Sequence, residues 1–209
     1  MQRRVYNFAL FKKHRISFPI DNMADELFIK AILQKGNEAR QKVQSEFSNL
    51  SLQQLNWKAS PESWSIAQCL NHLVVSDSSY FSILEKITDG SYQASFWRKY
   101  SPFSKVFGRV LKDQLREQVG RKLKAPKKFL PAASEFSMEI LERYYKNLDD
   151  FSGLIARCRN IDLDKTVITS PAVSFVTYSL RDAMQFLMQH EHRHINQAAR
   201  IKMNENFPK

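Results

Sequence analysis

The chain contains few of the residues that interrupt helices. Only 5 glycines and 7 prolines occur among its 209 residues, which argues against a β-rich protein with many tight turns and favours long helices joined by a few loops. Its 2 cysteines are too few for a disulfide framework, so a reducing cytoplasm is the simpler expectation. No apolar run approaches the ~20 residues needed to span a bilayer. We therefore expect a cytoplasmic protein without a membrane partner.

The positive charge, +11 in total, is distributed unevenly. Residues 1–22 carry a net charge of +4 and residues 98–128 a net charge of +9, whereas residues 23–97 are at −2 and residues 129–209 at zero. The first stretch has no apolar core of useful length, so we expect a flexible basic extension rather than a signal peptide, followed by one domain over 23–209. The second could attract anions, but no groove-reading motif accompanies it, and we expect no nucleic-acid binding.

Four segments repeat apolar residues at three- and four-residue steps, which predicts amphipathic helices. Their approximate ranges are Met23–Phe47, Ser65–Ile87, Ala133–Arg157 and Ser179–Met203. In the first of them the repeating positions are Leu27 or Phe28, Ala31 or Ile32, Lys35, Ala39, Val43 and Phe47. We expect a turn and then a loop between the first two.

Two of these helices have clear starting signals. Ser65 and Gln68 are spaced as a capping box, in which each side chain bonds the other residue's backbone amide. Ser179 can cap the last helix, with Asp182 adding negative charge in its first turn. The loop before that helix is expected to hold some extended structure at Thr166–Thr169.

A long connection, residues 88–131, separates the second and third helices. Its apolar residues between 96 and 111 suggest a short helix that covers one end of the molecule, and connections of this length are usually functional. Four amphipathic helices with such a crossover predict an all-α four-helix bundle.

The most distinctive stretch lies near the C-terminus, where His190, His192 and His194 account for three of the five histidines. Residues four apart on a helix point in nearly the same direction, so His190 and His194 share the apolar face. His192 is about 200° from His190 around the axis and is expected to face solvent, as Glu191 and Arg193 are in part.

A fourth histidine, His72, faces inward on the second helix among small side chains. Three inward histidines would repel one another if charged and would leave lone pairs unsatisfied if neutral. One divalent metal satisfies His72, His190 and His194 together. The alternative is a set of core-edge histidines bonded to neighbours such as Ser76 or Ser79.

These motifs resemble those of the DinB-like superfamily. Residues 64–73, Trp-Ser-Ile-Ala-Gln-Cys-Leu-Asn-His-Leu, look like its W-S-x-x-x-x-x-x-H-L signature, and residues 190–197 look like its H-x-x-R-H-x-x-Q ending. Residues 124–131 are similar to a loop of one subgroup, and the resemblance spans about 24–201. It implies a four-helix bundle with one metal held by His72, His190 and His194, and Gln197 beside them.

The better-known relatives implied by this resemblance are bacillithiol S-transferases and mycothiol-dependent maleylpyruvate isomerases. We therefore hypothesise a metal-dependent thiol transferase or hydrolase that acts on a small-molecule substrate, with a low-molecular-weight thiol as a candidate cofactor. The alternative is a non-catalytic, stress-associated binding module with a structural or vestigial metal. Zinc, nickel, iron and manganese all tolerate three histidines, and exposed helix faces lead us to expect a homodimer.

No general base is assigned from the sequence. Glu191 adjoins His190 but is rotated by about 100° from it. Tyr80, Tyr144 and Tyr178 are candidates, although each is more typical of a core aromatic residue. Cys69, one turn before His72, could approach the metal but is more typical of a buried structural thiol.

Overall fold

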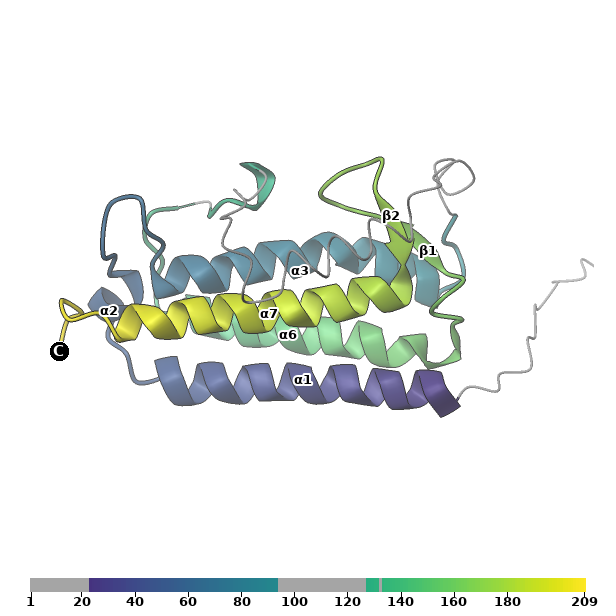
Figure 1. Cartoon of the computed structure of the whole chain (residues 1–209), viewed down its shortest axis with the longest axis horizontal. Helices are drawn as coiled ribbons and strands as arrows, with labels where there is room; N and C mark the ends of the chain where they lie inside the picture. The colour runs from purple at the N-terminus through teal and green to yellow at the C-terminus, as the bar shows by residue number, and fades with distance from the viewer. Residues whose placement is uncertain (1–22, 94–126, 132) are drawn as a thin grey trace, which may run out of the picture.

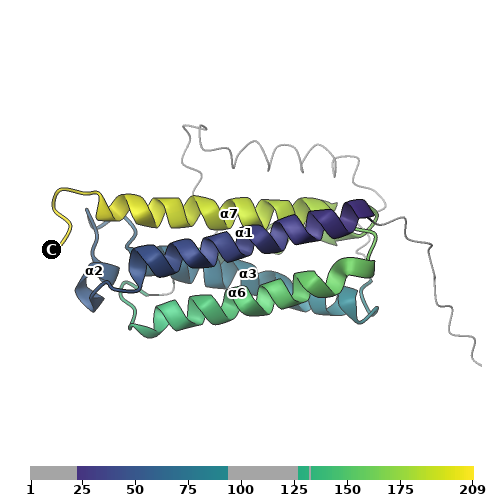
Figure 2. The ribbon, with the colours of Figure 1, turned by 90° about the horizontal axis from the view of Figure 1, so that it is seen from below.

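The computed structural model describes residues 23–93, 127–131 and 133–209. Most of this part of the chain is helical, which confirms the predicted helical class. The long helices α1 (Met23–Phe47), α3 (Ile66–Thr88), α6 (Glu139–Arg157) and α7 (Leu180–Lys202) lie side by side along the molecule (Figures 1 and 2). α3 packs against α6 and α7, and α1 packs against the same two helices. This arrangement places α1 and α3 on opposite sides of the shared core.

The β-hairpin lies at one end of the long helices and α2 (Leu52–Asn56) at the other (Figure 1). β1 (Val167–Thr169) pairs antiparallel with β2 (Thr177–Ser179) just before α7, with Ile168 opposite Tyr178. This hairpin agrees with the extended structure expected near residue 166, but it makes the purely α-helical description incomplete. The 3-10 helices are η1 (Lys127–Phe129) and η2 (Cys158–Asn160).

The predicted cap of α3 is present and a second one was missed. Ser65 Oγ accepts a hydrogen bond from the Gln68 amide, and the Gln68 side chain bonds the Ser65 amide in return. Ser51 and Gln54 form the same capping box at the start of α2 (Leu52–Asn56), where we had expected a turn and a loop. The Ser-x-x-Gln spacing that identifies α3 also identifies α2.

α6 begins at Glu139, five or six residues later than predicted. The reason lies at Phe136, whose amide donates to Asn56 Oδ1 at 2.9 Å and whose carbonyl accepts from Asn56 Nδ2 at 2.8 Å. These bonds between α2 and the incoming chain hold Phe136 outside the helix. α7 begins as predicted, because Ser179 Oγ accepts from the Asp182 amide at 3.0 Å.

Most of the predicted inner face of α1 is confirmed, because Ile32, Ala39, Val43 and Phe47 are buried. The first turn differs, since Leu27 is 60 % exposed and Ile29 is buried instead. Gly36 also lies on this inner face, where an added Cβ would make an ordinary contact 3.5 Å from Ser152 Oγ of α6.

The buried apolar residues form two clusters, and a polar layer separates them. One cluster holds Met188 on α7 and Tyr80 on α3, and the other holds Ile195 and Leu73 on the same two helices. Between them lie buried polar residues on each helix, of which Asp77 and Glu191 are completely inaccessible (0 % exposed). The histidine cluster described below lies at this same level of α3 and α7.

Several predictions concern residues outside the described ranges. They are the basic extension 1–22 and the short helix expected between 96 and 111. Within the described ranges, no helix is both long enough and apolar enough to cross a membrane.

Candidate metal centre

Three histidines from two helices meet at one point. α3 contributes His72, and α7 contributes His190 and His194, which lie one helical turn apart. One ligand atom from each forms a group in which all atoms lie within 4.8 Å of one another. The structure thus brings together the three residues singled out by the sequence, in a group that could hold a metal ion.

The ring of His72 is held at both nitrogen atoms. Nδ1 lies 2.7 Å from the carbonyl oxygen of Phe129 in η1, and Nε2 lies 3.1 Å from Nε2 of His190. A carbonyl can only accept, so Nδ1 carries the proton and the lone pair of Nε2 points toward the other histidines. Ligand histidines in metal sites usually donate their second N–H in this way. The partner is a backbone atom from the distant connection, not Ser76 or Ser79 as we had considered.

All three imidazoles are neutral at neutral pH. Burial, followed by the charges of His72 and Arg193, lowers the pKa of His194 to about 3. Burial, followed by the charges of His194, His72 and Arg193, lowers the pKa of His190 well below its ordinary value. Burial also lowers the pKa of His72, against the opposing effect of its bond to Phe129. Neutral rings leave their lone pairs available to a metal.

The geometry fits a single divalent ion. Histidine nitrogens bind zinc at ~2.0–2.1 Å, so two of them on one ion lie about 3 Å apart. The separation between the His72 and His190 Nε2 atoms is 3.1 Å. The Nδ1 atoms of His190 and His194 are buried and have no hydrogen-bond partner among the described residues. Gln197 interacts with His194 and raises its pKa, which agrees with the neighbouring role that the resemblance implied.

Aromatic rings surround the histidines. Trp64 is stacked on His194, with ring centroids 5.8 Å apart, and lies against His72 at 5.0 Å. Phe186 is stacked on His190 at 5.9 Å and 14°. Phe186 was not predicted as a site residue, although its position one turn before His190 on the same helix face is readable from the sequence.

Glu191 is completely buried, which corrects the expectation that it is partly exposed. Its Oε2 accepts a hydrogen bond from the Tyr144 hydroxyl at 2.9 Å, and its charge acts on the neighbouring carboxyl group of Asp77. Two buried carboxyl groups that interact in this way are not both ionised. Burial and the charge of Glu191 raise the pKa of Asp77 well above its ordinary value, so Asp77 holds the proton. The signal was present in the sequence, since Glu191 continues the three- and four-residue spacing of Met188 and Ile195.

The other candidates are core residues. The hydroxyl groups of Tyr80 and Tyr178 bond each other, and Tyr144 bonds Glu191. Burial raises the pKa of Cys69 to about 12, so its thiol stays protonated, as expected for a structural cysteine. His192 is half-buried rather than exposed.

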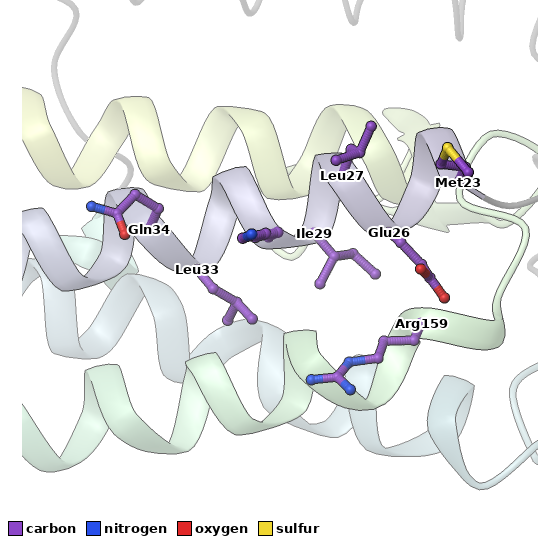
Figure 3. Close-up of a pocket in the computed structure, with 8 residues that line it drawn as sticks. Met23, Glu26, Leu27, Ile29, Leu33, Gln34 and Arg159 are labelled. Atoms are coloured by element: carbon purple, nitrogen blue, oxygen red, sulfur yellow. The ribbon is translucent and has the colours of Figure 1, made fainter.

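A separate hollow lies at the start of α1, with a volume of about 610 Å³. It is lined by the first three turns of α1 and by Arg159 of η2. Figure 3 shows Glu26 of α1 pointing toward the side of the hollow where Arg159 begins, while the Arg159 guanidinium group extends away from Glu26 along the hollow. No histidine lines this groove, so it is distinct from the three-histidine group.

The fold and the site together define a helical protein with a three-histidine group in a polar layer of its core. The sequence profile of the DinB superfamily matches residues 37–198, and the chain belongs to this superfamily. It is similar to the uncharacterized protein YuaE of Bacillus subtilis (strain 168), with 27 % identity over 168 residues that cover 79 % of this chain and 94 % of the relative. No solved structure matches the chain significantly.

Proposed function

We propose that this protein is a DinB-type four-helix bundle in which His72, His190 and His194 hold one divalent metal for thiol transfer or hydrolysis. Its substrate would be a small molecule. The observation that carries the proposal is the convergence of three neutral imidazoles from two helices within 4.8 Å. Three protein ligands leave at least one coordination position for a thiol or water, as in catalytic rather than structural sites.

The chemistry supplied by a bound metal would be a lower pKa for a coordinated thiol or water. The surrounding side chains would prepare the site. The Phe129 carbonyl fixes the tautomer of His72, and Trp64 restrains two imidazole rings. No acidic side chain belongs to the ligand group, so the metal charge stays uncompensated, which favours the thiolate or hydroxide form.

The metal site can be tested before any reaction is known. We expect about one equivalent of metal per chain in the purified protein, and a loss of most of it in His72→Ala. His192→Ala is the matched control, because this histidine is on the same helix as two of the ligands but outside the group. Equal metal content in wild type and His72→Ala would refute the site. The same analysis would show whether zinc, nickel, iron or manganese is bound.

The reaction is tested with the metal-loaded protein. We expect it to accelerate conjugation of a low-molecular-weight thiol to a soluble electrophile, and His190→Ala to lose this activity while His192→Ala retains it. A metal-replete protein without activity across panels of thiols and hydrolysable esters would exclude the enzymatic proposal.

One observation favours the alternative, a non-catalytic binding module with a structural metal. His72 is bonded to the backbone of η1, so a metal there would also fasten the long connection to the helices. This alternative predicts that metal removal lowers the unfolding midpoint while no activity is found. The homodimer expected from the sequence is tested independently by measuring the molar mass of the purified protein with light scattering.

A further inference from the structure

The imidazoles of α7 form a row with an aromatic ring at each end. Phe186 is stacked on His190 with ring planes 14° apart, and Trp64 is stacked on His194 with ring planes 21° apart. Both aromatic side chains and both of these histidines are half-buried, whereas His72 is only 4 % exposed. The accessible side of the histidine group therefore lies along this row.

The two aromatic rings differ in their contacts. Trp64 packs against two of the three imidazoles, His194 and His72. It comes from the residue before the cap of α3, so its position is tied to the start of that helix. These contacts give Trp64 a positioning role for the ligands.

Phe186 has a different setting. Its stacking partner among the three histidines is His190, and it packs at the edge of the apolar cluster that contains Met184 and Leu187. A half-exposed phenyl ring next to the ligand-binding group offers a flat apolar surface. Aromatic groups prefer such surfaces, in offset-stacked or edge-to-face contact.

The charge of the site indicates a second feature of a preferred ligand, the group that would bind the metal. Histidine ligands bring no negative charge to a metal, and Arg193 of α7 is close enough to His190 and His194 to act on both as a positive charge. With a divalent metal bound, the net field favours an anionic ligand group. We propose that Phe186 determines the specificity of this site, and that the ligands it favours join a small anionic metal-binding head to a planar aryl group. This inference rests on the proposed metal site.

Two hydroxamates with the same metal-binding head test it. The zinc-loaded protein, freed of excess metal by gel filtration, is titrated with benzohydroxamate and with acetohydroxamate in a calorimeter. We expect benzohydroxamate to bind roughly five- to tenfold more tightly, because its ring stacks on Phe186 and is removed from water. Phe186→Ala should lose most of this preference and bind acetohydroxamate as the wild type does.

Two further variants control for folding and for general loss of aromatic surface. Phe186→Leu keeps apolar bulk without a planar face, so it should fold and show a reduced preference even if Phe186→Ala does not fold. Phe175→Ala removes a phenyl ring that is 59 % exposed and outside the histidine group, and it should retain the preference.

The outcomes separate the two proposals. Equal affinity of wild type for both probes overturns the inference, as does a preference that survives in both Phe186 variants. Weaker binding of both probes by the same factor in Phe186→Ala also overturns it, because that result assigns Phe186 to positioning His190. If the wild type retains no zinc, the metal site itself fails before any probe is added, and the inference fails with it.

Discussion

At the scale of single residues, the feature of this core that is most costly to bury is the pair of carboxyl groups of Asp77 and Glu191. Both side chains are 0 % exposed, and a buried carboxylate is costly unless it is well bonded. Glu191 accepts a hydrogen bond from the Tyr144 hydroxyl, whereas burial and the charge of Glu191 raise the pKa of Asp77 well above its ordinary value. The charge therefore stays on Glu191 and the proton on Asp77.

This assignment predicts that Asp77→Asn is tolerated, because the amide is neutral and has nearly the same size and shape as the protonated carboxyl group. It also predicts a pH signature. A carboxyl whose folded pKa lies above its unfolded value makes stability fall as pH rises from the unfolded pKa toward the folded one, by up to about 1.4 kcal/mol per pH unit. Asp77→Asn lacks this loss, so its free energy of unfolding relative to wild type should rise with pH above 4.

Urea denaturation at a series of pH values measures the effect. Asp77→Ala is the contrasting variant, since it shortens a completely buried side chain and leaves a cavity, at a cost of about 0.5–3 kcal/mol. If the difference between Asp77→Asn and wild type does not change with pH, Asp77 is not the protonated member of the pair.

At the scale of elements, the end of the long connection is fastened to α2 and α3 by side chains. His72 bonds the carbonyl of Phe129, Gln68 donates to the carbonyl of Ala133 at 3.1 Å, and Asn56 bonds Phe136 at both its amide and its carbonyl. The first of these three attachments involves a candidate metal ligand. Metal binding and the order of η1 should therefore be coupled.

We expect metal loading to slow hydrogen exchange in residues 127–131, and tryptic cleavage after the exposed Lys128, by roughly two- to tenfold. The reason is that a metal at Nε2 holds His72 in the tautomer that donates to Phe129, and one such bond contributes about 0.5–1.5 kcal/mol. Residues 133–136 serve as an internal control, because Gln68 and Asn56 fasten them without a metal ligand. Unchanged exchange in 127–131 on loading would show that the two are not coupled.

The sequence predicts the structural features that depend on contacts between residues close together in the chain, and it misses those that depend on distant contacts. The starts of α3 and α7 follow from Ser65 and Ser179, whose bonds are to residues three positions away. Helical phase likewise places His190 and His194 on one face. The start of α6 depends instead on Asn56, which is 80 residues from Phe136, and the tautomer of His72 depends on Phe129, 57 residues away. Such distant contacts leave no periodic pattern in a single sequence.

At the scale of the whole molecule, a polar layer divides the apolar core into two clusters. α7 shows the division plainly, since Met188 lies in one cluster, Ile195 in the other, and Glu191 between them. The histidine group lies at the same level. The candidate metal site is built from polar side chains and lies between the two apolar clusters. Because these side chains can bind protons or a metal ion, the stability of the whole fold should depend on pH and on metal.

For the metal-free protein, we expect the free energy of unfolding to fall as the pH is lowered. The folded pKa of His194 is about 3, below the ordinary value of about 6.5, so the unfolded chain binds more protons between these two values. Stability is therefore fully present above pH 6.5 and is lost as pH falls. Between pH 7 and pH 5, His194 alone should cost on the order of 1–2 kcal/mol, and the lowered pKa values of His190 and His72 act in the same direction.

Urea denaturation in the presence of a chelator at pH 7 and pH 5 tests this prediction, with His194→Gln as the variant that lacks one titrating ring. We expect the variant to lose less stability than wild type on acidification. Metal should raise the stability of the wild type at pH 7 by about 2.7 kcal/mol at a hundredfold excess over Kd, and that of His194→Gln by much less, because the variant lacks one of the three imidazole ligands. A metal-induced stabilisation of equal size in wild type and in His194→Gln would mean that the stabilising ion is not bound by His194.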